Sequence, residues 1–184
     1  MKKAVFLDRD GVINREVDHV RSMKQLRLLP KVDNAIRLLN KEGYLVIIVT
    51  NQPVVARGWI TEKGLKSIHA ELRHRLVKKG AEINSIFYCP HHPKADLIKY
   101  RKNCLDRKPD VGLIIKAVKK FNISLEDSFL VGDTTTDIKT AKNAGITSIL
   151  LKTGYGGKDK TFKIKPDYIA KNLLEATIKF ILTR

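Results

Sequence analysis

The sequence lacks several features that would direct it to particular classes of protein. No apolar run approaches the roughly 20 residues that a membrane-spanning helix requires, and Met1-Lys2-Lys3 leads into an apolar stretch too short for a signal peptide. Only two cysteines occur, Cys89 and Cys104, so a disulfide framework is not expected. Internal repeats and low-complexity tracts are also absent. We therefore expect a cytoplasmic protein with no membrane partner.

Acidic residues are scarce relative to basic ones. The chain has 19 Asp and Glu against 36 Lys and Arg, which gives a formal net charge of +17. Such a balance attracts anionic substrates or polyanions. The sequence shows neither aromatic stacking platforms nor a recognised nucleic-acid-binding motif. We therefore interpret the basic residues as a solvated surface, and nucleic acid is not an expected partner.

The 184 residues, 43% of them hydrophobic, predict one domain over 1–184 with a sizeable core. Strand and helix patterns alternate, which is typical of a parallel sheet with helices on both faces, a Rossmann-like three-layer α/β/α fold. Strands are predicted over 4–7, 44–50, 83–88, 128–133 and 147–151, and helices over 32–41, 61–79, 111–121, 137–144 and 170–182. Residues 89–109 are expected to be irregular and residues 154–160 to form a mobile loop.

Two acids follow the first predicted strand in the stretch "VFLDRDGVIN". Asp8 and Asp10 are two residues apart, so on an extended chain their side chains point the same way. The carboxyl ends of strands are where ligands bind in an open α/β sheet. Two like charges side by side are costly unless a cation or a proton lies between them. The pair therefore predicts a metal site, and Gly11 lets the chain turn directly after it.

Other polar residues fall at the same predicted edge of the sheet, because the carboxyl ends of parallel strands converge there. They are Thr50-Asn51-Gln52 after the second strand, Asp106-Arg107-Lys108-Pro109 before a helix, and Asp133 after the fourth strand. Carboxylates, a hydroxyl and a lysine suit phosphoryl transfer, whose catalysis is mainly positioning and charge neutralisation. Asp137 is interpreted either as a further site acid or as a helix-start acid favoured by the helix dipole. His69 and His74 are expected on a polar helix face without a role.

Four motifs, "FLDRDGVIN", "VTNQ", "RKP" and "VGDTTTD", resemble in order those of the haloacid dehalogenase superfamily phosphatases. The stretches "VTNQPVVARG", "FYCPHHP" and "CLDRKPD" are similar to the branch that contains heptose bisphosphate and histidinol-phosphate phosphatases. The resemblance covers about residues 3–154. A lone Asp-x-Asp is weak evidence, but four motifs in order at strand ends are specific.

This resemblance implies an enzyme that hydrolyses phosphoric monoesters, with a role for each matched residue. Asp8 would attack phosphorus and form an aspartyl-phosphate, and Asp10 would act as general acid and then general base. Thr50 and Lys108 would hold the phosphoryl oxygens. Mg²⁺ would be bound by Asp8, the backbone carbonyl of Asp10, and Asp133.

The gaps between the motifs leave no room for a separate cap domain, so we expect loops to cover a small phosphorylated metabolite. The resemblance implies D-glycero-D-manno-heptose 1,7-bisphosphate as substrate, cut at the 7-phosphate, and we expect the protein to be a monomer. The residues expected to contact substrate are Asp18, His19, Asn51, Gln52 and Arg107. Histidinol phosphate, a nucleic-acid 3′-phosphate and a non-catalytic binding role are the alternatives.

The irregular stretch contains a pattern typical of zinc ligands, with Cys89, His91 and Cys104. In the resembling family the loop carries Cys-x-His and Cys-x-Cys, and here Asp106 stands at the last position. A carboxylate is a harder donor than a thiolate. We expect structural Zn²⁺ on Cys89, His91 and Cys104, with Asp106, His92 or a water as the fourth ligand. The alternative is a loop held by packing, with two reduced thiols.

Overall fold

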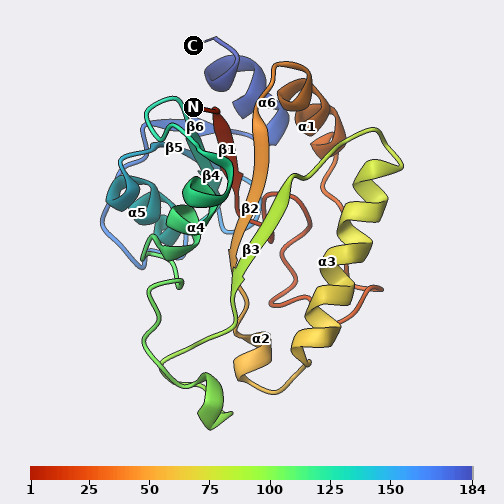
Figure 1. The fold of residues 1–184 in the computed structure, drawn as a ribbon, viewed down its shortest axis with the longest axis vertical. Coiled ribbons are helices and arrows are strands. Elements are labelled where there is room, and N and C mark those ends of the chain that lie inside the picture. The colour runs from red at the N-terminus through yellow and green to blue at the C-terminus, as the bar shows by residue number, and fades with distance from the viewer. Residues whose placement is uncertain (184) are drawn as a thin grey trace.

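The computed structural model describes residues 1–183, whose six strands form one parallel sheet in the order β3-β2-β1-β4-β5-β6 (Figure 1). The strands are β1 (Ala4–Leu7), β2 (Leu45–Asn51), β3 (Ser85–Cys89), β4 (Phe129–Gly132), β5 (Thr147–Leu151) and β6 (Tyr168–Ala170). β1 lies between β2 and β4, so the chain order reverses on either side of it. That reversal is the switch point at which open α/β sheets bind ligands.

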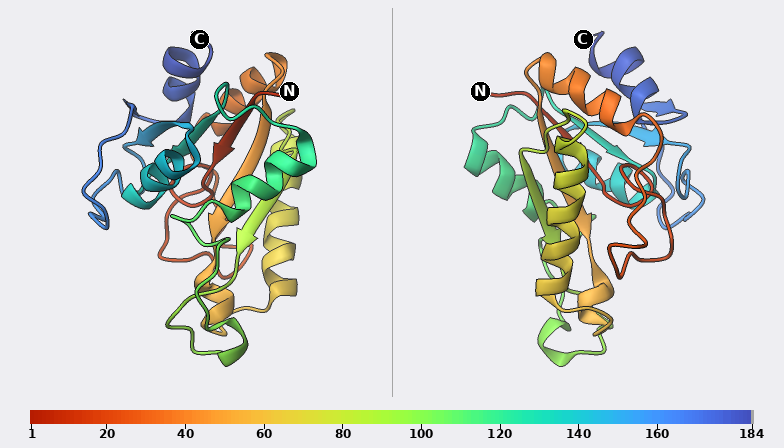
Figure 2. Two further views of the ribbon diagram at one scale, coloured as in Figure 1. Left: turned by 60° about the vertical axis from the view of Figure 1, so that its left-hand side comes forward. Right: turned by 90° about the vertical axis from the view of Figure 1, so that its right-hand side faces the viewer.

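Helices cover both faces of the sheet, as the two side views show (Figure 2). The α-helices are α1 (Val32–Lys41), α2 (Pro53–Ala56), α3 (Glu62–Val77), α4 (Gly112–Phe121), α5 (Thr135–Ala144) and α6 (Leu173–Ala176). A 3₁₀ turn, η1 (Ile98–Tyr100), and a π-helical segment, η2 (Thr177–Ile181), complete the list. Core residues from α1, α3 and α6 pack on one face, and those from α4 and α5 pack on the other. The predicted three-layer fold without a cap domain is confirmed.

β1 is the most enclosed part of the sheet. All four of its side chains are fully buried, and they alternate between the two core clusters, Val5 and Leu7 in one and Ala4 and Phe6 in the other. A strand covered on both faces needs this continuous apolar character. Its registers with β2 and β4 fix the point at which the chain leaves the sheet after Leu7.

The helices nearest the site begin and end at residues that the sequence marks clearly. The Thr61 side chain caps α3 by accepting a hydrogen bond from the backbone N–H of Gly64. At the start of α5, Thr134 and Asp137 form a reciprocal capping box. Gly145 ends α5 in the left-handed region, with φ 68°. These caps fix the positions of the loops that precede the helices.

The C-terminal region differs from the prediction of a helix over 170–182. β6 pairs with β5 through Leu151 and Ala170, and the helix begins only after Asn172, whose side chain accepts from the backbone N–H of Glu175. A strand of three residues shows no periodicity in sequence, and pairing with β5 decides its conformation. α2 has only 4 residues, too few for a helical spacing of apolar residues to be recognised in the sequence. Within residues 1–183, no helix is both long and apolar enough to cross a membrane.

Candidate active site

The carboxyl ends of β1 and β4 bring two acids together. The backbone N–H of Asp8, just after β1, donates a hydrogen bond to the carbonyl of Val131 on β4 at 3.0 Å. Asp133 follows β4 and is 1% exposed. Gly11 allows the close approach, because it has φ 75° and a Cβ there would lie 2.1 Å from Oδ2 of Asp133. Both its conformation and the space around it therefore demand glycine.

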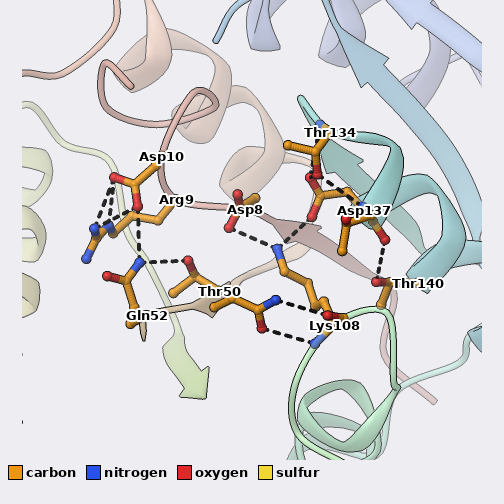
Figure 3. Close-up of polar contacts among 11 residues, drawn as sticks. Asp8, Arg9, Asp10, Thr50, Gln52, Lys108, Thr134, Asp137 and Thr140 are labelled. Carbon is orange, nitrogen blue, oxygen red and sulfur yellow. Dashed lines mark hydrogen bonds and ion pairs between the residues drawn. The ribbon is translucent and has the colours of Figure 1, made fainter. Parts of the chain in front are cut away.

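Lys108 connects Asp8 to a third acid, Asp137 (Figure 3). The Lys108 Nζ lies 3.0 Å from Oδ1 of Asp8 and 2.6 Å from Oδ1 of Asp137. The Thr134 hydroxyl donates to Oδ2 of Asp137 at 2.6 Å. Asp137 is therefore both the helix-start acid and the site acid that the sequence left as alternatives.

Burial and charge act together on the titration of this group. Burial alone would lower the pKa of Lys108, but Asp137 and Asp8 raise it above its ordinary value. Burial raises the pKa of Asp8 to about 6, although Lys108 opposes the change. Burial and the neighbouring carboxylates Asp8 and Asp137 raise the pKa of Asp133 to about 8. Three acids share one lysine, so the site lacks positive charge.

Asp10 is held beside this group by separate contacts. The Arg9 guanidinium binds both its oxygens, with Nη2 at 2.7 Å from Oδ2 and 3.0 Å from Oδ1. The side-chain amides of Asn14 and Gln52 donate to Oδ1 at 2.8 Å and to Oδ2 at 3.1 Å. Burial alone would raise the pKa of Asp10, but Arg9 and the hydrogen bonds lower it below its usual range. Asp10 is therefore ionised and fixed in orientation.

The residues after β2 position other residues of the site. The Gln52 amide that binds Asp10 also donates to Oγ1 of Thr50 at 3.0 Å. The Asn51 side chain donates to the carbonyl of Lys108 and accepts from its backbone N–H, both at 3.0 Å. From the sequence, Asn51 and Gln52 are expected to contact substrate. In the structure their amides are directed at the protein itself, because the strand end turns them toward the residues they hold.

Three of the expected zinc ligands come together in the loop after β3. The His91 Nδ1 lies 3.2 Å from Sγ of Cys104 and 3.8 Å from Sγ of Cys89. Asp106 is not a member of this group. Its carboxylate forms an ion pair with Lys116 on α4, which supplies a cationic partner close in sequence.

The same loop has contacts that do not involve a metal. The Glu62 carboxylate at the start of α3 accepts hydrogen bonds from Tyr88 on β3 at 3.0 Å and from Tyr100 at 2.9 Å. The Arg107 guanidinium donates to the carbonyl of His91 at 3.1 Å. Protein contacts therefore contribute to the order of the segment that leads to Lys108.

The loop that contains Asp18 and His19 meets the segment after α2. Both residues have positive φ, 50° and 82°. The His19 ring lies 5.6 Å from the ring of Trp59, and the Arg21 guanidinium lies 3.7 Å from the Trp59 ring centroid. Trp59 is the only tryptophan of the chain and lies outside the sequence motifs. This contact joins loops from β1 and β2.

His69 is buried, contrary to expectation. It was expected on a polar face of α3, but it is 6% exposed and its Nε2 lies 3.1 Å from Nη1 of Arg9. Its spacing held the signal, because His69 lies four residues after Leu65 and three before Leu72, both fully buried. His74 is exposed, as expected.

Known proteins provide an independent comparison. Residues 105–176 match the HAD-hydrolase-like family model. A D-glycero-beta-D-manno-heptose-1,7-bisphosphate 7-phosphatase of Rhodopseudomonas palustris is 41% identical over 145 residues, 79% of this chain and 81% of its own. A relative from Thermosynechococcus vestitus, named D-glycero-D-manno-heptose-1,7-bisphosphate 7-phosphatase, is 34% identical over 99% of this chain and 96% of its own. The chain belongs to the haloacid dehalogenase phosphatases.

A solved structure is similar over the whole length of both chains. It is the D,D-heptose 1,7-bisphosphate phosphatase of B. bronchiseptica complexed with magnesium and phosphate, with a TM-score of 0.88, 28% identity and 100% coverage of each chain. The protein is accordingly an enzyme, a phosphoric monoester hydrolase, and haloacid dehalogenase phosphatases use Mg²⁺.

The carboxylates of this chain fit that ion. Asp8, Asp133 and Asp137 each offer an oxygen within 4.8 Å of the others, and Mg²⁺ prefers oxygen ligands. Both oxygens of Asp137 are engaged, Oδ1 by Lys108 and Oδ2 by Thr134. Asp8 contacts Lys108 through Oδ1 and Asp133 accepts from Tyr155 through Oδ2, which leaves one oxygen of each for the cation. A divalent cation would also supply the positive charge that the site lacks.

We expect Mg²⁺ to stabilise the protein more as the pH rises from about 5 to about 8. The raised pKa values, about 6 for Asp8 and about 8 for Asp133 against an ordinary 3.8, mean that protons compete with the cation. In the metal-free protein, stability from these groups is fully present below pH 3.8 and is lost as pH rises through about 6 and then about 8. Thermal unfolding with and without MgCl₂ across this range measures the difference.

Asp133→Asn is the control for this prediction. The variant should show a smaller rise in Tm on adding Mg²⁺ and a weaker dependence of that rise on pH. A Tm shift in the parent protein that stays constant from about pH 5 to about pH 8 would contradict the assignment of these carboxylates to the cation.

Proposed function

We propose that the chain removes the 7-phosphate from a D-glycero-D-manno-heptose 1,7-bisphosphate. The observation that carries the proposal is the position of Lys108 between Asp8 and Asp137. Asp10, two residues after Asp8, is held at the same edge of the sheet by Arg9. The relatives named for this activity support the choice of substrate, and they include enzymes named for the beta and the alpha form of the sugar.

In the first step, a carboxylate oxygen of Asp8 attacks phosphorus and the bond to the sugar oxygen breaks. Asp10, which is ionised in the free protein, takes up a proton from solvent as the phosphate dianion binds beside it, and gives that proton to the departing alkoxide. Lys108 and the Thr50 hydroxyl hold the phosphoryl oxygens. Gln52 supports this arrangement, because its side-chain amide donates hydrogen bonds to both Asp10 and Thr50. It therefore holds these two side chains next to each other in the site.

In the second step, Asp10 takes a proton from water, and the hydroxide oxygen attacks the phosphorus of the aspartyl-phosphate. The bond between phosphorus and Asp8 breaks, which releases inorganic phosphate and restores the free carboxylate. Mg²⁺, when held by Asp8, the carbonyl of Asp10, and Asp133, supplies positive charge against the phosphoryl oxygens. Asp137 keeps Lys108 in place through both steps.

We assign contact with the rest of the substrate to Asp18, His19 and Arg107. Asp18 and His19 lie in the loop that meets Trp59, and Arg107 precedes Lys108. Asn51 and Gln52 act instead as positioning residues, since their side-chain amides are already bonded to Lys108, Asp10 and Thr50.

A panel of phosphate esters tests the substrate. The purified protein with Mg²⁺ should show its highest kcat/KM with the heptose bisphosphate, followed by histidinol phosphate and a 3′-phosphorylated oligonucleotide. Asp8→Asn is the control for contaminating phosphatases and should release no phosphate from any ester. A higher kcat/KM for histidinol phosphate or for the oligonucleotide would overturn the assignment.

We also propose that Cys89, His91 and Cys104 bind one structural Zn²⁺, with a water as fourth ligand. The support is their mutual distances and the thiol and imidazole chemistry that zinc prefers. Burial raises the pKa of Cys89 to about 12 in the metal-free loop, so binding must displace a proton. The ion would join the two ends of the loop that leads to Arg107 and Lys108.

Elemental analysis of the purified protein tests the zinc site. The parent protein should hold one equivalent of zinc, and Cys89→Ser should hold far less. Asp106→Asn is the matched control and should keep its zinc, because Asp106 pairs with Lys116. A parent protein without zinc would contradict the site, and loss of zinc in Asp106→Asn would contradict the ligand set.

A further inference from the structure

Arg9 is the largest of the fully buried side chains, with none of its surface exposed. Burying an isolated charge is costly, so its partners show what the position requires. Two of its three nitrogens, Nε at 3.2 Å and Nη2 at 2.7 Å, bind Asp10. The third, Nη1, lies 3.1 Å from Nε2 of His69 on α3.

His69 accepts the hydrogen bond from Arg9, because a guanidinium can only donate. Its Nε2 therefore carries no proton, and the neutral ring carries its proton on Nδ1. Burial, with Arg9 as the nearest cation, lowers the pKa of His69 to about 3 and keeps the ring neutral. The ring also packs edge-on against Tyr88 of β3, with centroids 5.5 Å apart. The orientation of the acceptor is thus set by α3 and β3.

We propose that Arg9 and His69 are positioning residues that hold the carboxyl group of Asp10 where the leaving oxygen departs. His69 fixes the plane of the guanidinium, and the guanidinium fixes the plane of the Asp10 carboxylate. The inference rests on the proposed function, in which Asp10 gives a proton to the leaving alkoxide.

Residue 9 must supply two parallel N–H donors to the Asp10 carboxylate, and a positive charge alone is not enough. Two parallel hydrogen bonds define the plane of a carboxylate, whereas a lysine ammonium acts as a point charge. Asn14 and Gln52 each make one contact with Asp10, at 2.8 Å and 3.1 Å, and Asn14 belongs to the same turn as Asp10. Arg9 and His69 therefore connect the acid to a different part of the fold.

Two substrates with different leaving groups distinguish a positioning role of Arg9 and His69 from a merely structural one. The alkoxide of a sugar needs a proton as it departs, whereas p-nitrophenolate is stable without one. Because kcat/KM covers only the steps up to departure of the leaving group, misplacing Asp10 should affect the sugar phosphate selectively. His69→Leu should lower kcat/KM for the heptose bisphosphate by about tenfold to a hundredfold. With p-nitrophenyl phosphate the loss should be less than about threefold.

Three further variants make the test specific. His69→Gln offers an oxygen that accepts from Arg9 and should restore kcat/KM for the sugar phosphate to near the parent value. Arg9→Lys keeps the charge but not the paired N–H donors, and it should show the same selective loss of kcat/KM for the sugar phosphate as His69→Leu. Arg9→Lys also tests the inference if His69→Leu does not fold. His74→Leu, on the exposed face of α3, is the matched control and should leave kcat/KM unchanged for both substrates.

Asp10→Asn distinguishes failure of this inference from failure of the proposed function. If Asp10 is the acid, this variant loses far more with the sugar phosphate than with the aryl phosphate. Equal loss for both substrates in Asp10→Asn would overturn the proposed role of Asp10. A selective loss in Asp10→Asn, with equal or no loss in His69→Leu and Arg9→Lys, would overturn the positioning role of Arg9 and His69 alone.

Discussion

The ion pairs of Lys108 are the interaction on which the site depends. Its buried ammonium lies 3.0 Å from Asp8 and 2.6 Å from Asp137, and Asp133 stands close to both acids. One lysine cannot neutralise three carboxylates, so the protein keeps a deficit of positive charge at the carboxyl end of its sheet. That deficit attracts a divalent cation, and the same charges then act on a phosphoryl group. An excess of negative charge in the ligand-free site favours binding of the cation, and the bound cation then offsets the charge of the phosphate group.

Much of the surrounding structure keeps this group in place. Asn51 holds the backbone of Lys108 on both sides, and the capping box of α5 holds Asp137. The backbone N–H of Tyr155 donates to Oδ2 of Asp133 at 2.7 Å, so the loop expected to be mobile packs against a proposed metal ligand. These contacts come from four different parts of the sequence. Their common effect is that the charged atoms are positioned before substrate arrives.

Sequence reasoning succeeded where local patterns determine structure. The bounds of α1 and of β5 are as predicted, because amphipathic spacing specifies the helix and a short, largely apolar stretch after Gly145 specifies the strand. The site acids were found because strand ends converge. The differences from the predictions involve contacts that join separate elements of the fold. Three-residue β6 takes its conformation from β5, Asp106 is taken by Lys116 on α4, and His69 has a partner 60 residues away. Local sequence shows neither the pairing of β6 nor the ion pair of Asp106, whereas the spacing of His69 from Leu65 and Leu72 already indicated its burial.

Detection of a covalent intermediate on Asp8 tests the central claim most directly. Mixing the enzyme rapidly with the heptose bisphosphate and Mg²⁺, quenching in acid and reducing with borohydride would convert an aspartyl-phosphate to homoserine. We expect homoserine at residue 8, and none in Asp8→Asn, because the Asp8 carboxylate is the nucleophile of the proposed first step. Steady turnover in a protein whose residue 8 never carries the modification, or its appearance at Asp10 or Asp137 instead, would contradict the account.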